Sequence, residues 1–347
     1  MKKSPAANRV STGIVELMEN LLLIRLKSIG DVVFTLPAVA ALRERFPAAK
    51  ITFLTSKENV PLLRGFRGVN DVIALDRAAF RSGHPLIMVP EFFRLLRRLR
   101  AGKFSLVVDF QGFGETAWLA RLTGASQRWG SVYGAGRRWA YTRGLTRDEK
   151  LHPADWNLQL LADCGVKAGT VKNAFSLPAD ALAAARNFFA DNKLDAGRPT
   201  LVIQPFTSTA QKNWPLENFL AVARHWQERG VQVVFTGGPE DRGALEPARA
   251  ENFCTATHLP LLVSAGLTQL AALTLGGDSG LGHLAVASGQ RVVMLMMHKN
   301  PGACVPFQHT DWAIVPGKPG RIREITVEQV LAETGKVLNP PPRSVSC

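Results

Sequence analysis

Short apolar runs alternate with segments of helical period along almost the whole chain. In the first half the apolar runs predict strands and the periodic segments predict helices. Strands are expected near 21–26, 50–55, 71–75, 104–109 and 127–130, and helices near 35–46, 57–65, 90–101, 114–123 and 153–164. Strands that alternate with helices indicate βαβ units and a parallel sheet. Residues 133–151 are rich in Gly, Arg and aromatic residues without a clear period, which predicts a long functional loop.

The same alternation restarts in the second half. Strands are expected near 199–204, 231–236, 261–263, 274–277, 291–297 and 312–315, and helices near 179–192, 215–229, 240–250, 267–273, 279–288 and 326–337. Residues 165–178 lack a long apolar run and predict a linker. We therefore predict an α/β protein with two doubly wound domains, residues 21–177 and 178–337, an extension at 1–20 and a disordered tail at 338–347.

Composition agrees with a soluble, two-domain protein of the cytoplasm. The chain has 347 residues, 46% of them hydrophobic and 20% charged. No apolar run approaches the roughly 18–20 residues of a membrane span, and the first twenty residues lack the apolar stretch of a secretory signal. The four cysteines are widely spaced, which supports neither a zinc site nor a disulfide framework and favours a reducing compartment.

The net charge of +14 predicts an anionic partner. Nucleic acid, an anionic membrane surface and a phosphorylated or carboxylated substrate all fit this charge. A nucleic-acid-binding module is disfavoured, because no recognition motif is visible and the aromatic residues do not interleave with the basic runs. Four arginines of one expected helix form either a membrane-facing patch or an ordinary solvated face: Arg94, Arg97, Arg98 and Arg100.

Two segments, 21–37 and 275–295, are each an apolar strand that ends in a Gly-containing turn and opens into a helix. An aspartate stands at each turn, Asp31 in the first and Asp278 in the second. Ligands of open α/β sheets bind at the carboxyl ends of strands, so the two turns predict two half-sites that face one cleft. Asp31 could equally be a helix N-cap. Free amides at the second turn could hold a diphosphate without a metal.

A nicotinamide-dependent oxidoreductase is the alternative from another class of enzyme. Gly280, Gly282 and Ala285 form a G-x-G-x-x-A pattern, as do residues 112–117. A dinucleotide site also needs an acidic residue about 20 positions further on, for the ribose. Between Asp278 and Asp311, and between Glu115 and Asp148, the sequence has no Asp or Glu. Both patterns are therefore weak.

The segments RLKSIGDVVFTLPA, at 25–38, and GDSGLGHLAVASGQRVVML, at 277–295, resemble glycosyltransferase family 9, the bacterial heptosyltransferases. The resemblance extends over roughly residues 21–335. It implies a GT-B fold, in which two Rossmann-like domains face a central cleft. It also implies an inverting, metal-independent transfer of heptose from ADP-heptose to the inner core of lipopolysaccharide, with no cofactor. The acceptor would be an anionic glycolipid at the cytoplasmic face of the inner membrane, and the enzyme would touch that anionic surface transiently. Another nucleotide-sugar donor, or an acceptor outside lipopolysaccharide, is the nearest alternative.

The resemblance also implies roles for individual residues. Asp31 would be the base that takes a proton from the acceptor hydroxyl. Lys212, in a Lys-x-Trp-Pro motif, would bind the diphosphate, and Glu240 would hold the ribose hydroxyls. The other donor-binding residues would be Thr207, Ser208, Asp278, Ser279, Gly280, Leu281 and His283.

On the acceptor side, Asp109 and Gln111 belong to a motif that resembles the family's D-x-Q-G turn, although Asp109 could equally be a buried cap. Lys27 could keep the site electropositive, and the basic residues Arg137, Arg138 and Arg143 would recognise the acceptor. His152 and Asn157 resemble an H-x-x-x-x-N element that is either structural or acceptor-lining. The chain departs from the family after residue 297, where many members continue with Phe-Gly-Pro-Thr. This departure bears on the donor sugar rather than on the class of reaction.

Overall fold

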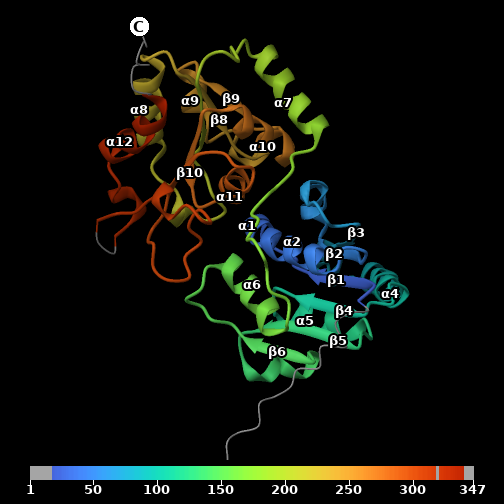
Figure 1. Cartoon of the computed structure of the whole chain (residues 1–347). Coiled ribbons are helices and arrows are strands. Elements are labelled where there is room, and N and C mark those ends of the chain that lie inside the picture. The colour runs from blue at the N-terminus through green and yellow to red at the C-terminus, as the bar shows by residue number, and fades with distance from the viewer. Residues whose placement is uncertain (1–17, 318–319, 340–347) are drawn as a thin grey trace, which may run out of the picture.

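The structure is a computed structural model that describes residues 18–317 and 320–339. It has two halves, each built on a six-stranded sheet (Figure 1). The first sheet consists of β1 (Asn20–Ile24), β2 (Lys50–Ser56), β3 (Asp71–Leu75), β4 (Leu106–Asp109), β5 (Gln127–Val132) and β6 (Arg143–Thr146). The second consists of β7 (Thr200–Gln204), β8 (Gln232–Thr236), β9 (Cys254–Ala256), β10 (Leu273–Gly277), β11 (Val292–Leu295) and β12 (Ala313–Ile314). The expected extension and tail lie almost wholly outside the described residues.

Both sheets are parallel and have the same strand order, which confirms the predicted fold class. The order is β3-β2-β1-β4-β5-β6 in the first sheet and β9-β8-β7-β10-β11-β12 in the second. In the first sheet, Leu22 of β1 is paired with Thr52 of β2 and with Val107 of β4. Successive strands are therefore added on one side of the sheet from β1 to β3 and on the other side from β4 to β6. The same change of side occurs between β7 and β10. These are the switch points where open α/β sheets bind ligands.

Helices cover both faces of each sheet, so the central strands are almost fully buried and mainly apolar. The α-helices of the first half are α1 (Ile29–Val33), α2 (Leu36–Arg45), α3 (Arg77–Arg81), α4 (Pro85–Ala101), α5 (Gly114–Leu122) and α6 (Pro153–Asp163). Those of the second half are α7 (Ala179–Asp191), α8 (Leu216–Gln227), α9 (Glu246–Ala250), α10 (Leu261–Leu270), α11 (Gly280–Ala287) and α12 (Val327–Leu338). In the first half, α2 and α6 pack on the sheet face that carries Leu21 and Leu23, and α4 and α5 on the face that carries Leu22 and Ile24.

The two halves are joined by residues 165–178, which contain neither helix nor strand. The expected domain boundary at 177–178 falls between α6 and α7. This segment still touches both halves, because the Phe175 amide donates to the carbonyl of Ala287 and the Ser176 amide donates to that of Gly65. The halves also meet where α1 and α11 lie side by side (Figure 1).

Several elements differ from the sequence-based expectation. A short helix, α1, begins already at Ile29, and the expected helix at 57–65 is a 3-10 helix, η2 (Lys57–Gly65), which contains Pro61. The expected loop at 133–151 contains a 3-10 helix, η3 (Ala135–Ala140), and the edge strand β6. The expected strand at 261–263 is wrong, because these residues begin α10, and β9 at Cys254–Ala256 was not predicted. The run at 261–263 is short and wholly apolar, so its period could not separate a strand from a buried helix.

Candidate active site between the two halves

A cavity of about 650 Å³ lies between the two halves. Its first-half wall is the start of α1, and its second-half wall comes from the loops that follow β7, β8 and β10. Because β1, β7 and β10 flank the switch points, sequence-distant loops converge here. The cavity brings Asp31 together with every donor-binding residue expected from the sequence: Thr207, Ser208, Lys212, Glu240, Asp278, Ser279, Gly280, Leu281 and His283.

Asp31 lies in the first turn of α1, and the N-cap of that helix is Ser28 rather than Asp31 itself. Its Oδ2 accepts hydrogen bonds from the Ser28 amide, at 2.8 Å, and from the Ser28 hydroxyl, at 3.2 Å. Its Oδ1 forms an ion pair with Arg25 Nη2 at 2.6 Å. Asp31 therefore completes a capping box and keeps about a third of its side chain exposed towards the cavity, 31%.

The sequence analysis missed Arg25, which holds the carboxylate of Asp31. The side chain of Arg25 is almost fully buried and also donates to the carbonyls of Phe110, at 2.8 Å, and Lys27, at 3.1 Å. Burial alone would raise the pKa of Asp31, but the charge of Arg25 and the hydrogen bonds from Arg25 and Ser28 outweigh it and lower that pKa. A single Arg inside the apolar run LLLIRL is a pattern that could have revealed it, since a buried guanidinium needs a partner.

Lys212, Asp278 and His283 form a connected network at the donor side of the cavity. Lys212 Nζ lies 2.6 Å from Asp278 Oδ2, and His283 Nε2 lies 2.9 Å from Asp278 Oδ1. Burial would raise the pKa of Asp278, but hydrogen bonds and charge from His283 and Lys212 lower it to about 2. Burial would lower the pKa of Lys212, but the hydrogen bond and the charge of Asp278 raise it. Both groups are therefore ionised at neutral pH, and the lysine is held at the cavity wall.

The N-terminus of α11 opens into the same cavity. Ser279 is its N-cap: the hydroxyl accepts from the Gly282 amide at 3.1 Å and donates to Gln204 Oε1 at 2.6 Å. The first amides of a helix have no partner within the helix, so those of Gly280 and Leu281 can bind an anion.

Gly280 has a second use that the sequence did not suggest. A Cβ atom at this position would lie 2.7 Å from Cβ of Ile29, so the glycine lets α1 and α11 pack against each other. On the other side, a Cβ atom at Gly30 would lie 3.2 Å from the ring of His283. The side-chain-free face of Gly280 is therefore covered by the first half, while the residue still lines the cavity.

Glu240 and Asp241 differ in how they are held. Asp241 Oδ2 accepts from the Gly238 amide at 2.8 Å and so stabilises the turn after β8. Glu240 is exposed and lines the cavity. In the neighbouring loop, the hydroxyl of Thr207 donates to Asn213 Oδ1 at 2.9 Å, whereas Ser208 is exposed. Glu240 and Ser208 are thus available to a ligand, while Asp241 shapes the turn.

Asp109 and Gln111 contradict the expectation that their side chains line the acceptor side, because both are buried. Asp109 accepts hydrogen bonds from the Tyr141 hydroxyl at 2.6 Å and from the amides of Gln111 and Gly112, and its burial raises its pKa. Gln111 Oε1 accepts from the Leu26 amide at 2.9 Å. These residues fix the turn after β4 against the turn after β1, and therefore position Arg25 and Asp31 rather than touch a substrate.

Among the three arginines expected to contact the acceptor, only two lie towards the carboxyl edge of the sheet. Arg137 Nη1 donates to the carbonyl of Gly112 at 3.1 Å, and Arg138 Nη2 donates to the Thr146 hydroxyl at 3.0 Å. Arg143 is the first residue of β6 and donates to the carbonyl of Asp163, at the end of α6. Arg143 therefore lies at the amino end of β6, whereas the cleft is at the carboxyl ends of the strands. Its assignment to the acceptor is wrong.

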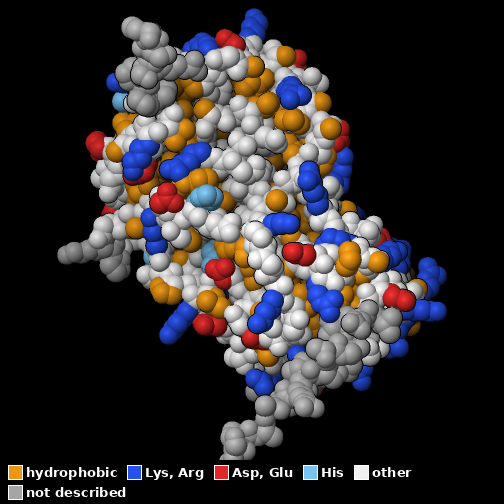
Figure 2. Space-filling model, in the orientation of Figure 1, with side chains coloured by type: hydrophobic (Ala, Val, Ile, Leu, Met, Phe, Trp, Pro, Cys, Tyr) orange, Lys and Arg blue, Asp and Glu red, His pale blue; other side chains and the backbone are white. Residues whose placement is uncertain are grey.

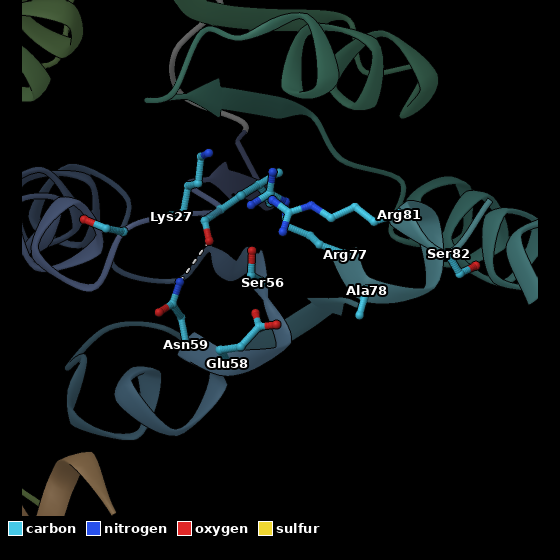
Figure 3. Close-up of a pocket in the computed structure, with 10 residues that line it drawn as sticks. Lys27, Ser56, Glu58, Asn59, Arg77, Ala78, Arg81 and Ser82 are labelled. Carbon is cyan, nitrogen blue, oxygen red and sulfur yellow. Dashed lines mark hydrogen bonds between the residues drawn. The ribbon is translucent and has the colours of Figure 1, made fainter. Parts of the chain in front are cut away.

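A second cavity, of about 470 Å³, lies next to the first one and within the first half (Figure 3). Arg77 and Arg81 extend into it from α3 towards the loop that carries Lys27, and Ser56 and Glu58 line its floor. Ser28 lines both cavities. The Ser56 hydroxyl is buried and has no hydrogen-bond partner among the described residues. Lys27 was expected on the acceptor side, whereas Arg77 and Arg81 were missed, although a pair of arginines four residues apart directly after a strand could have indicated them.

His152 and Asn157 support the cavity from the first half. His152 Nδ1 accepts from the Ala154 amide, and its Nε2 lies 3.1 Å from the carbonyl of Val305 in the second half. Burial and the neighbouring His283 lower the pKa of His152 to about 4, so it is neutral and donates to Val305. Asn157 donates to the carbonyl of Phe34 at 2.9 Å. Their role here is structural, and it ties the loop at 298–309 to α6.

Residues 18–317 and 320–339 contain no group of three or more His, Cys, Asp or Glu side chains that could hold a metal ion. In the same part of the chain, every helix is too short or too polar to cross a membrane.

Known proteins resemble this chain over most of its length. The sequence model for "Glycosyltransferase family 9 (heptosyltransferase)" matches residues 92–321. The lipopolysaccharide core heptosyltransferase OpsX of Haemophilus influenzae is 25% identical over 309 residues, which is 85% of this chain and 84% of that protein.

Two solved structures confirm the predicted GT-B fold. A family 9 glycosyl transferase from Veillonella parvula superposes with a TM-score of 0.82 at 22% identity and covers 92% of this chain and 97% of its own. The E. coli heptosyltransferase WaaC, solved with ADP-2-deoxy-2-fluoro heptose, superposes with a TM-score of 0.74 at 19% identity and covers 91% and 99%. With two thirds of its residues matched by the family model, the chain belongs to glycosyltransferase family 9, the heptosyltransferases.

Proposed function

We propose that the protein transfers heptose from ADP-heptose to an anionic acceptor of the lipopolysaccharide inner core. One observation carries this proposal: a single cavity joins the carboxylate of Asp31 to a lysine and a helix N-terminus suited to a diphosphate. A relative acts on the lipopolysaccharide core by name, and a protein of the same fold has been solved with an ADP-heptose analogue, which supports the donor and the acceptor class.

The proposed reaction is one displacement with inversion. The acceptor hydroxyl oxygen attacks the anomeric carbon of the heptose from the face opposite the diphosphate. The bond between that carbon and the phosphate oxygen breaks, ADP leaves with the electron pair, and Asp31 takes the hydroxyl proton. The lowered pKa of Asp31 makes it a weak base, so the proton moves late, after the anomeric centre has gained oxocarbenium character.

Lys212 and the first amides of α11 stabilise the negative charge that develops on the leaving diphosphate. A point charge and oriented N–H groups together can do the work that other enzymes give to a divalent cation. We therefore propose that no metal is required. Because Lys212 is paired with Asp278, diphosphate binding must draw its ammonium away from that carboxylate or share it.

The second cavity is the proposed site for an anionic group of the acceptor. Lys27, Arg77 and Arg81 supply positive charge, and Ser56 supplies a hydroxyl without a partner among the described residues. Guanidinium groups match carboxylates and phosphates in a bidentate manner. The cavity adjoins Asp31 through Ser28, so an acceptor held there would present a hydroxyl to the base. We assign the reaction to the cytoplasmic face of the inner membrane, where such a glycolipid is built.

The proposal is tested by turnover of a donor panel with one inner-core acceptor. The purified protein should release ADP from ADP-heptose and should be much less active with ADP-glucose or UDP-glucose. EDTA should leave the rate unchanged, and added Mg²⁺ should not raise it. A preference for another nucleotide sugar would replace the donor assignment, and a rate that is lost in EDTA and restored by Mg²⁺ would overturn the metal-independent mechanism.

The acceptor site is tested by the double substitution Arg77→Gln and Arg81→Gln. The acceptor KM should rise by about 10–100-fold, because two charged hydrogen-bond donors are lost, and ADP affinity should not change. The matched control is Arg143→Gln, an arginine at the opposite edge of the same sheet. Equal acceptor KM values for the double variant and the control would show that the second cavity does not hold the acceptor.

A further inference from the structure

We propose that the first ten residues of α4, together with Trp118 and Trp139, form a membrane-docking surface that inserts apolar side chains into an anionic lipid bilayer. This surface lies outside the active site. The bilayer as its partner rests on the proposed function, in which the acceptor is a glycolipid.

Within residues 18–317 and 320–339, the first half of α4 has no buried residue. Of its seventeen residues only Leu95 and Leu99 are buried, and both lie in the second half of the helix. In the first half, large apolar side chains face solvent: Leu86 is 87% exposed, Phe93 61% and Ile87 51%. Val89 and Phe92 are exposed as well. Five such side chains on three turns of one helix are a contiguous apolar surface rather than scattered exposure, and such a surface marks an interaction site.

Positive charge accompanies the apolar side chains. Arg94, Arg97, Arg98 and Arg100 follow along the same helix and are all exposed. Figure 2 shows Lys and Arg side chains gathered at the right of the lower half, the region where Figure 1 labels α4. A helix that combines exposed Leu, Ile and Phe with a row of arginines is typical of segments that lie in the interface of an anionic membrane. Two of these arginines have an acidic partner, Arg94 with Glu91 and Arg98 with Asp71, so Arg97 and Arg100 carry the excess positive charge that an anionic bilayer would neutralise.

Two exposed tryptophans belong to the same layer of the fold. Trp118 of α5 is 59% exposed and Trp139 of η3 is 49% exposed. The centroids of their two rings lie 4.6 Å apart. The helices α4 and α5 cover one face of the sheet and pack against each other, and η3 packs on α5. Tryptophan is favoured at the boundary between lipid and water, because its ring is apolar and its N–H is polar.

The docking surface is continuous with the second cavity. Arg81 and Ser82 line that cavity, and only Gly83 and His84 separate them from α4. Docking of α4 would therefore bring the cavity to the membrane surface. A glycolipid whose acyl chains stay in the bilayer could then place its anionic sugars against Arg77 and Arg81 without leaving the membrane.

Vesicle sedimentation without nucleotide or glycolipid tests the surface independently of heptose transfer. The wild-type protein should bind vesicles of phosphatidylcholine with phosphatidylglycerol more strongly than vesicles of phosphatidylcholine alone. The triple variant Leu86→Ser, Ile87→Ser, Phe93→Ser should lose about 10–100-fold of its partition into the mixed vesicles. Val171→Ser, an exposed apolar residue of the linker, is the control and should bind like wild type. Melting temperatures should stay equal, because none of these side chains is buried.

A charge-only variant separates the two contributions. Arg97→Gln with Arg100→Gln should weaken binding to the anionic vesicles by about tenfold and leave binding to neutral vesicles unchanged. Arg186→Gln with Arg323→Gln, two exposed arginines of the second half, is the matched control. Wild-type partition by the serine variant would overturn the proposal. So would a wild-type dimer, in sedimentation velocity, that the serine variant converts to a monomer, because the surface would then be an interface between two copies. Failure of heptose transfer with normal vesicle binding would instead reject only the proposed function.

Discussion

Replacement of Asp31 by Asn is expected to lower kcat by about 10²–10⁴-fold, the usual contribution of a positioned base. Asn is close to Asp in size and can still accept a hydrogen bond from the Ser28 amide, but it cannot take a proton. The Kd for ADP, measured by calorimetry, should stay near wild type, because the donor-binding residues belong to the second half.

The same substitution removes the charge partner of the buried Arg25. The free energy of unfolding should therefore fall by about 1–3 kcal/mol, the range for an interaction with a charged group, although Arg25 keeps its bonds to Phe110 and Lys27. For this reason kcat must be measured at a temperature where the variant is fully folded. A purely structural Asp31 would give an active Asp31→Asn enzyme and a damaged Asp31→Ala enzyme.

The pH profile supplies a second test of Asp31. A carboxylate with a lowered pKa stays ionised above its ordinary value near 3.8 and gains a proton only below it. The acidic limb of kcat/KM that belongs to Asp31 should therefore lie below pH 4. A base that titrates near pH 6 would have to be another residue.

Replacement of Lys212 by Ala is expected to raise the Kd for ADP by about 10–100-fold, because a hydrogen bond to a charged group is lost. Removal of the ammonium also leaves the carboxylate of Asp278 with His283 as its remaining partner in the network, so the site becomes more repulsive to a diphosphate. Isothermal calorimetry with ADP and with adenosine isolates the effect, since only the diphosphate should lose affinity.

Lys172→Ala is the matched control, because this exposed lysine lies in the linker and does not line the cavity. An unchanged Kd for ADP in the Lys212→Ala variant would mean that the lysine stays on Asp278 when the nucleotide binds. In that case the diphosphate would be held by the amides of α11 alone.

The features that sequence reasoning found are those fixed by a few consecutive residues. A strand, a glycine turn and a helix start are local patterns, so Asp31 and the turn at Asp278 could be located and given a common cleft. The roles of the donor residues came from the resemblance to the family, and the structure places these residues in one cavity. Local patterns also identified both doubly wound sheets, because the central strands β1 and β7 are short, mainly apolar runs between helical segments.

The features that sequence reasoning missed depend on long-range packing. Asp109 and Gln111 have the residue types of a polar site, but only the sheet order shows that they are enclosed by β1, β5 and Tyr141. By residue type Arg143 cannot be told from Arg137 and Arg138, but it is the first residue of β6 and therefore lies at the amino ends of the strands. Arg25 is paired with Asp31, six residues away, and Arg77 with Glu115, 38 residues away. Charge and residue type alone do not tell which side of a sheet a side chain reaches.

The close packing of α1 on α11 has a mechanical consequence. At Gly280 no side chain separates the two halves, so their backbones approach closely beside Asp31 and Asp278. If one half rocks on the other, we expect the outer rims of the cleft to move more than this close contact. Substrates would then enter and products would leave by the widening of those rims, while the separation between Asp31 and the turn at Asp278 changes little.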